Sequence, residues 1–232
     1  MSTARWSTLA RTFCCVALLA VVLGWLLAAP APLVRVGHAR EVVTRNPKMG
    51  VHTRLTDEVE EWKIQRTLTM VREMGAPWIV EYFPWGYMEP EKGRYEWQHA
   101  DMVIDHALAQ GLTVIGRIDF VPDWARPANT TYRYLGEDHF GDLAAFVQAF
   151  VARYGERVPY VVIWNEPNLS LEWGYRPPDP AGYARLLHLC YKAAKAANPK
   201  VQVVLAGLAP TTAPEGDAWG IDDLLYLSLI HI

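Results

Sequence analysis

The sequence contains little cysteine. Its 232 residues include three cysteines, and Cys14 and Cys15 both lie in an uncharged, apolar stretch near the N-terminus. Cys190 alone remains for the rest of the chain, which excludes a disulfide framework and a cysteine-ligated metal site. Because Cys190 lies among leucines and alanines at helical spacing, the sequence predicts that it packs in the core as a small apolar side chain.

Positive charge is also scarce outside the N-terminal region. The formal net charge is −3, but residues 1–40 contain four arginines and no acidic residue, so the remainder carries 18 basic against 25 acidic residues. Nucleic acids and other polyanions are therefore poor candidate partners. With 51% hydrophobic residues and 10 tryptophans, the chain has enough apolar material for a sizeable core, which excludes a disordered protein.

The N-terminal segment has the pattern of an export signal. Between Arg11 and Arg35 the chain carries no charge, and its apolar centre, residues 13–29, is 17 residues long. This length is at the lower limit for crossing a bilayer, so a cleaved signal peptide and an uncleaved anchor with membrane contact through residues 12–34 both fit. Ala39 offers a cleavage site. We therefore expect a protein that is secreted or is anchored in the membrane outside the cytoplasm.

From Met49 onward, short apolar runs alternate with stretches of helical periodicity. This alternation predicts a parallel sheet with crossover helices. The strands are expected at residues 49–54, 78–83, 112–119, 158–164 and 201–207, and the helices at about residues 64–74, 99–110, 140–154 and 180–197.

Several helix boundaries carry local signals. Asp57 and Glu60 have the spacing of a capping box before the first helix, and Gly75 is expected to end it. Asp179 and Pro180 predict the N-cap and the first helical position of the fourth helix. In the first two helices, the positions expected in the core are Ile64, Leu68, Val71, Met74, Val103, Ile104, Ala107 and Leu108.

No glycine-rich phosphate-binding turn follows the first strand. Residues 49–58, MGVHTRLTDE, contain neither a G-x-G-x-x-G nor a Walker pattern. The sequence therefore lacks the motifs that usually indicate nucleotide binding. A doubly wound sheet and a barrel both fit the order of strands and helices, and in barrels the chemistry collects at the C-terminal ends of the strands. The histidines show no metal-ligand spacing, so the sequence suggests neither a metal nor an organic cofactor.

The sharpest chemical signal is the motif WNEPN at residues 164–168, at the end of the fourth predicted strand. A carboxylate in this position, flanked by Trp164 and Trp173, has the partly dry surroundings that raise a carboxyl pKa toward the range of a general acid. Asn165 beside Glu166 can donate a hydrogen bond to a sugar hydroxyl without adding charge. The alternative is a solvated loop glutamate with Asn and Pro as turn residues.

Three longer segments extend the pattern: PWGYMEPEKGRYEW at 84–97, DFVPDWARP at 119–127 and VVIWNEPNLSLEWGYRPPDPAGYARLL at 161–187. Together with the preceding strands and helices, they resemble the clan of retaining glycoside hydrolases with (β/α)₈ barrels, in particular family 39 and neighbouring family 5-like bacterial enzymes. The resemblance covers about residues 49–225. It implies a carbohydrate substrate, Glu166 as the general acid/base and Asn165 as the contact to the substrate 2-hydroxyl.

Further candidates for substrate binding lie at or just after the predicted strand ends: His52, Glu81, Trp85, Asp119, Trp124 and Trp173. Each has a plainer alternative. The histidine can be a capped surface residue, and the tryptophans can be part of the core. Asp119 has Arg117 as its neighbour two residues earlier on the same face, and a pair inside the barrel can be structural, which applies to Glu81 as well. Where related enzymes often have an arginine on strand two, this chain has Val80. The substrate contact implied at that position therefore has no counterpart here.

The predicted fold is α/β, a partial (β/α)₈ barrel with about five of eight βα units. Retaining glycosidases need a second carboxylate about 5 Å from the acid/base, which the resemblance places on strand seven. The acids that follow the fifth predicted strand are in the wrong place for this role, so the sequence assigns no nucleophile; they are Glu215, Asp217, Asp222 and Asp223.

The chain divides into an export segment at residues 1–39, the N-terminal part of the barrel at 40–225 and a tail at 226–232. Because the final SLIHI departs from the expected polar helix face, we expect a C-terminally truncated chain with a non-native end. Three functions stay open: an exported retaining glycoside hydrolase, a non-catalytic carbohydrate-binding or envelope assembly protein, and an inactive fragment. The sequence makes no prediction of the oligomeric state.

Overall fold

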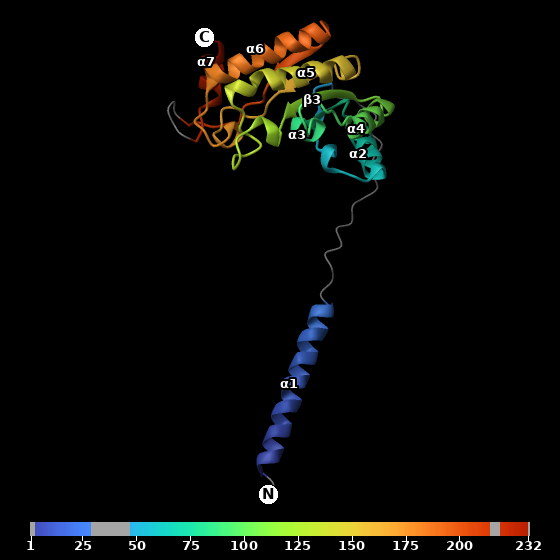
Figure 1. Cartoon of the computed structure of the whole chain (residues 1–232). Coiled ribbons are helices and arrows are strands. Elements are labelled where there is room, and N and C mark those ends of the chain that lie inside the picture. Colours follow the sequence, from blue (N-terminus) through green and yellow to red (C-terminus); the bar gives the residue numbers. More distant parts are fainter. Residues whose placement is uncertain (1–2, 29–46, 214–218, 232) are drawn as a thin grey trace. The chain divides into compact units, whose positions relative to one another are not determined.

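The computed structural model describes residues 3–28, 47–213 and 219–231. The chain forms two compact units, Met1–Glu41 and Val42–Ile232. The first contains the helix α1, Thr3–Ala28 (Figure 1). Within the described residues, no helix combines the length and the apolar character needed to cross a membrane. Ala39, Glu215 and Asp217 lie outside the described residues.

The second unit is built on one sheet of five parallel strands in the order β1-β2-β3-β4-β5. The strands are β1 Gly50–Thr53, β2 Trp78–Pro84, β3 Thr113–Asp119, β4 Tyr160–Ile163 and β5 Gln202–Leu205. All five predicted strands are confirmed. Neighbouring strands follow one another in sequence without the reversal of a doubly wound sheet, so the order is that of a partial barrel.

Helices connect the strands and cover one face of the sheet (Figure 1). They are α2 Glu61–Glu73, the short α3 Trp85–Met88, α4 Gln98–Ala109, α5 Phe140–Tyr154, α6 Pro180–Ala197 and α7 Asp223–His231, with 3₁₀ turns η1 Leu55–Asp57, η2 Asp123–Ala125, η3 Glu137–His139 and η4 Leu171–Trp173. The predicted helices are confirmed, and α5 and α6 pack side by side (Figure 1).

The local boundary signals have mixed outcomes. The Asp179 side chain accepts a hydrogen bond from the Gly182 N–H at 2.8 Å, which confirms the N-cap of α6. The predicted capping box of α2 is wrong, because Asp57 ends η1 and pairs with Arg54, while the N-cap Glu60 makes no side-chain cap bond.

Six of the eight apolar positions predicted in the core of the first two helices are buried. The exceptions are Met74, which is 48% exposed, and Leu108, which is 37% exposed. Met74 is the C-cap of α2 and therefore lies beyond the helical repeat that faces the sheet. Leu108 lies in the last turn of α4, where the apolar face of the helix ends.

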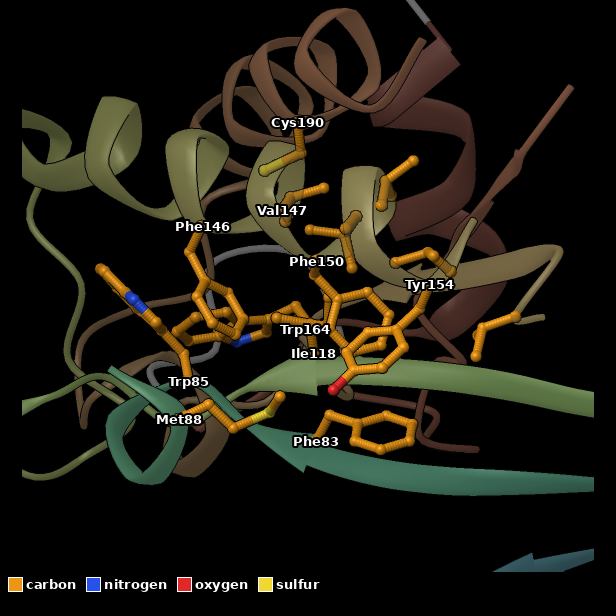
Figure 2. Packing of buried hydrophobic residues seen from close by; sticks show 14 of the residues in the cluster. Phe83, Trp85, Met88, Ile118, Phe146, Val147, Phe150, Tyr154, Trp164 and Cys190 are labelled. Atoms are coloured by element: carbon orange, nitrogen blue, oxygen red, sulfur yellow. The ribbon is translucent and has the colours of Figure 1, made fainter. Parts of the chain in front are cut away.

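The core lies between the sheet and the covering helices (Figure 2). The ring centroids of Phe83 on β2 and Phe150 on α5 are 5.1 Å apart, and burial of each such ring contributes about 1.5–3 kcal/mol. Cys190 on α6 is fully buried, as predicted, and its side chain points toward α5 (Figure 2).

The two faces of the sheet follow from the alternation of side chains along each strand. Ile79 and Phe83 on β2, and Ile118 on β3, point into the helix-covered core. The side chains between them point the opposite way, to what we call the inner face. Its residues on β1 to β3 are His52, Val80, Tyr82, Ile115, Arg117 and Asp119.

Candidate active site

The chain turns sharply after β4 and brings the WNEPN motif to the C-terminal edge of the sheet. Trp164 and Glu166 have positive φ angles of 76° and 41°, a conformation that is uncommon for residues other than glycine. Hydrogen bonds hold both residues in place. The Trp164 N–H donates to the Ile118 carbonyl at 2.9 Å, and the Glu166 N–H donates to the Gly207 carbonyl at 3.0 Å.

Asn168, the last residue of the motif, ties the loops behind the site together. It is fully buried, and its amide nitrogen donates to the carbonyl oxygens of Ala209 at 2.9 Å and Ile221 at 3.0 Å. Its oxygen accepts a hydrogen bond from the Ala209 N–H at 2.9 Å. Asn168 is therefore a structural residue that fixes the turn on which Asn165 and Glu166 are placed.

A chain of polar contacts orients Asn165. Its side-chain oxygen accepts a hydrogen bond from Arg117 Nη1 at 2.6 Å, and its side chain also bonds to the Glu172 carboxylate. The amide nitrogen of Asn165 carries two hydrogens and can therefore donate to more than one acceptor. Glu166 is the next residue after Asn165 and is half-buried.

Glu172 is a second carboxylate close to Glu166. Burial raises its pKa, and the negative charges of Asp119 and Glu166 act in the same direction, while Arg133 and the bond from Asn165 oppose them. Arg133 Nε lies 3.0 Å from Glu172 Oε2. The charge of Glu166, the predicted acid/base, therefore contributes to the raised pKa of Glu172.

Asp119 lies at the end of β3 and is fully buried. Its carboxylate pairs with Arg133 Nη1 at 2.7 Å and with Arg117 Nε at 3.5 Å. As placed, it has no surface to offer to a sugar, contrary to the predicted contact. Instead it holds the two arginines that in turn bind Asn165 and Glu172.

His52 on β1 shares the inner face with this group and is exposed. Partial burial of the ring lowers its pKa, Arg117 and Arg54 act in the same direction, and Asp119 opposes them. The ring is therefore neutral at pH 7 and available as a hydrogen-bond donor and acceptor at the mouth of the site.

Glu81 does not join the site. It lies on the helix-covered face, one residue out of phase with the inner-face Tyr82, and is fully buried. Its Oε1 accepts hydrogen bonds from the backbone N–H groups of Leu55 at 2.9 Å and Thr56 at 3.1 Å. Burial raises the pKa of Glu81 to about 7. In this structure Glu81 therefore anchors the turn after β1 and lies apart from Asn165 and Glu166.

Two of the three tryptophans that were predicted to bind substrate are core residues. Trp85 is 0% exposed and donates a hydrogen bond to Glu89 Oε2 at 2.6 Å. Trp173 is 2% exposed and packs edge-on against Trp164, with ring centroids 5.7 Å apart. As placed in this structure, both rings are part of the core and offer no exposed face for substrate binding. Trp124 is half-buried and donates to the Glu89 carbonyl at 2.9 Å.

Sequence reasoning missed Arg133 and Glu172, and considered Arg117 only as the neighbour of Asp119. The spacing of Arg117 and Asp119 on one strand is a signal for their shared face. Arg133 and Glu172 come from separate loops, so their meeting depends on tertiary structure. Within the described part of the chain, no cluster of three or more His, Cys, Asp or Glu side chains could hold a metal ion.

Comparison with known proteins shows a resemblance to glycoside hydrolases. The family model described as β-galactosidase, glycoside hydrolase family 42, matches residues 55–119. A solved family 39 glycoside hydrolase from the gut symbiont Bacteroides cellulosilyticus WH2 matches with 25% identity and a TM-score of 0.57, over 69% of this chain and 31% of that chain. No curated protein sequence matches the chain.

Two further solved structures share the fold. The family 39 enzyme from Xanthomonas axonopodis pv. citri matches with 23% identity and a TM-score of 0.54, over 71% of this chain and 36% of that chain. A family 5, subfamily 18 enzyme from Streptomyces cattleya, in complex with GlcNAc, matches with 14% identity and a TM-score of 0.56, over 70% and 44%. The chain thus resembles (β/α)₈ glycoside hydrolases and spans less than half the length of each of these three structures.

Proposed function

We propose that the chain supplies the acid/base side of the active site of a retaining glycoside hydrolase. The observation that carries this proposal is the fixed pair Asn165 and Glu166 at the C-terminal edge of the sheet, with Asn165 held by Arg117 at 2.6 Å. In this role Glu166 donates a proton to the glycosidic oxygen as the bond breaks. In the same proposal, the Asn165 amide donates a hydrogen bond to the substrate hydroxyl next to the reacting carbon.

The surrounding charges suit this chemistry. A second acid, Glu172, lies close enough to interact with Glu166, and the negative charge of Glu166 is one of the causes that raise the pKa of Glu172. Arg117 and Arg133 compensate the buried carboxylate of Asp119, and Arg133 also pairs with the half-buried carboxylate of Glu172. We assign no nucleophile, since Asp119 and Glu81 are fully buried.

Replacement of Glu166 tests the proposal. In the full-length protein, Glu166→Gln should lower kcat/KM about 10²–10⁴-fold on aryl β-glycosides with poor leaving groups, which need a proton. Substrates with good leaving groups need no proton to depart and should lose far less in bond cleavage. The matched control is Glu73→Gln on the exposed part of α2, which should leave both rates unchanged. An equal loss on both substrate types, or no loss, would contradict the acid/base assignment.

A second candidate is carbohydrate binding without hydrolysis. It is favoured by the burial of Asp119, the inner-face carboxylate of β1 to β3, and by its ion pairs with two arginines, which do not leave it exposed to attack a sugar. If the wild-type protein binds β-linked oligosaccharides with an affinity that depends on Asn165 but cleaves neither type of aryl glycoside, this second function holds.

We also propose that the N-terminal segment directs export. The support is its uncharged stretch between Arg11 and Arg35. Expression in a bacterium, followed by cell fractionation and N-terminal sequencing, should find the protein outside the cytoplasm, with Arg40 at the N-terminus of the released form. A Leu19→Arg change in the apolar stretch should keep the protein in the cytoplasm. Wild-type protein that stays there would contradict the proposal.

A further inference from the structure

The polar contacts behind Asn165 close into a ring. Asp119 pairs with Arg117 Nε at 3.5 Å and with Arg133 Nη1 at 2.7 Å. Arg117 Nη1 donates to the Asn165 oxygen at 2.6 Å, and Arg133 Nε lies 3.0 Å from Glu172 Oε2. The bond between the side chains of Asn165 and Glu172 completes the ring. We call these five residues the Asp119 ring.

The chemistry of its members fixes which way the Asn165 amide points. An arginine side chain only donates hydrogen bonds, and an ionised carboxylate only accepts them. The amide can do both, so its oxygen faces Arg117 and its nitrogen faces Glu172. A flipped amide would place its N–H groups against the Arg117 guanidinium and its oxygen against the Glu172 carboxylate, and both bonds would be lost.

Asp119 joins the ring to the sheet. It is fully buried at the end of β3, and the Tyr82 side chain on β2 also bonds to its carboxylate. The Arg117 guanidinium lies over the Tyr82 ring, 4.9 Å from its centroid. Because a buried carboxylate needs its cations in place, Asp119 keeps both arginines where they meet Asn165 and Glu172.

The residues next to Asn165 and Glu172 fix these two side chains relative to each other. Trp164, directly before Asn165, donates from its indole Nε1 to the Glu172 carbonyl at 2.8 Å. Trp173, directly after Glu172, packs edge-on against the Trp164 ring, with centroids 5.7 Å apart. Both tryptophans are buried. The half-buried side chains of Asn165 and Glu172 therefore extend from a packed pair of tryptophans.

The loop that carries Glu172 also lies tightly against the loop that carries Arg133. Gly174 has a φ of 74°, and a Cβ atom at this position would lie 2.7 Å from the Cα atom of Tyr134. The Arg176 guanidinium lies over the Tyr134 ring, 4.3 Å from its centroid. A larger residue at position 174 would push the two loops apart and separate Arg133 from Glu172.

We propose that Glu172 is a positioning residue that acts on the substrate through Asn165. With its amide held between Glu172 and Arg117, Asn165 meets a ligand as a hydrogen-bond donor. A hydroxyl oxygen next to the reacting carbon can accept this bond, whereas a hydrogen in that place cannot, so the ring selects against 2-deoxy sugars. This inference rests on the proposed function, because it assumes that Asn165 contacts that hydroxyl.

Binding measurements with the full chain test this role without the need for hydrolysis. The probes are methyl β-D-galactopyranoside and methyl β-D-glucopyranoside, each compared with its 2-deoxy analogue by NMR titration. At least one parent sugar should bind the wild type about tenfold more tightly than its analogue, which is the value of one good hydrogen bond. Glu172→Ala should lose this preference. Glu172→Gln keeps an oxygen that accepts from Asn165 and should retain most of it.

A spectroscopic signal reports the surroundings of the Asn165 amide directly. In isotope-labelled protein its two N–H groups give a pair of NMR signals, which are assigned by their loss in Asn165→Asp. Glu172→Ala removes the partner of one N–H and should move its signal, whereas Glu172→Gln should move it less. The matched control is Glu137→Ala, which removes a carboxylate from a surface ion pair with Arg185 and should change neither the signals nor the preference. Circular dichroism checks that each variant is folded.

The two proposals fail in different ways. If Asn165→Ala keeps the preference for the parent sugar, the substrate contact proposed for Asn165 is wrong. If Asn165→Ala loses the preference while Glu172→Ala keeps it, that contact stands and Glu172 is not a positioning residue. The inference is also overturned if neither parent sugar binds the wild type, or if the Asn165 signals are the same in the wild type and in Glu172→Ala.

Discussion

The helix-covered face and the inner face of the sheet bury their side chains by different means. On the covered face, rings such as Phe83 and Phe150 fill the space between strands and helices. On the inner face, Asp119 and Tyr82 are buried by charged neighbours, since two arginines pair with the acid and Arg117 lies 4.9 Å from the centroid of the Tyr82 ring.

This difference explains where the predicted site residues are found. The residues of each strand alternate between an apolar layer and a polar one, and only the polar layer adjoins Asn165 and Glu166. Trp85 and Glu81 were expected at the site because of their residue types and their positions near strand ends. They belong to the covered layer, where Trp85 packs and Glu81 binds backbone N–H groups.

The largest effect on stability is expected on the covered face. Phe150 is fully buried and contacts Phe83 and Tyr154, so Phe150→Ala should lower the free energy of unfolding by about 3–5 kcal/mol. Phe150→Leu keeps most of the volume and should cost less. Urea denaturation followed by circular dichroism measures both variants. A loss below about 1 kcal/mol for the alanine variant would mean that this layer is not tightly packed.

On the inner face, loss of a charge should have a smaller effect that depends on pH. Arg133→Gln leaves Asp119 and Glu172 without one of their cations, and should destabilise the protein by about 2–4 kcal/mol at pH 7. The deficit should shrink at pH 4, because burial raises the pKa of Glu172 above its ordinary 4.5, and the protonated carboxyl group needs no cation. Urea denaturation at pH 4 and pH 7 measures it, with Arg185→Gln on the exposed surface of α6 as the control. A deficit independent of pH would contradict the charge pairing.

Glu81 provides a test on the covered face. Here the wild-type side chain is expected to lower the stability of the protein as pH rises, whereas Arg133 on the inner face is expected to increase it. The folded pKa of Glu81, about 7, lies above the ordinary 4.5, so the folded state binds more protons between these values and stability falls as pH rises through this window. Glu81→Gln keeps an oxygen for the two N–H groups and has no charge to bury. It should match the wild type near pH 4.5 and exceed it by roughly 2–3 kcal/mol above pH 7. Glu73→Gln is the exposed control, and parallel curves for wild type and Glu81→Gln would contradict the raised pKa.

Local sequence patterns predicted the fold well because the signals are contained in a few neighbouring residues. The stop at Gly75, which has a φ of 85°, and the buried positions Ile64, Leu68 and Val71 of α2 need no knowledge of the rest of the chain. The site was only partly predictable. The contacts of Arg133 with Asp119 and Glu172 join loops that are far apart in sequence, and the burial of Trp173 depends on Trp164 and Tyr183 beside it.

The smallest predicted effects concern two helix N-caps. The structure confirms the predicted cap of α6, whereas the predicted capping box of α2 is wrong. Asp179→Ala removes the hydrogen bond to the Gly182 N–H and should cost about 1 kcal/mol, whereas Asp179→Asn keeps an acceptor and should cost little. Glu60→Ala at the N-cap of α2 should change stability by less than about 0.5 kcal/mol, because no side-chain cap bond exists there. Urea denaturation measures all three. Equal losses at the two caps would show that helix dipole effects, which both acids share, outweigh the specific cap bond.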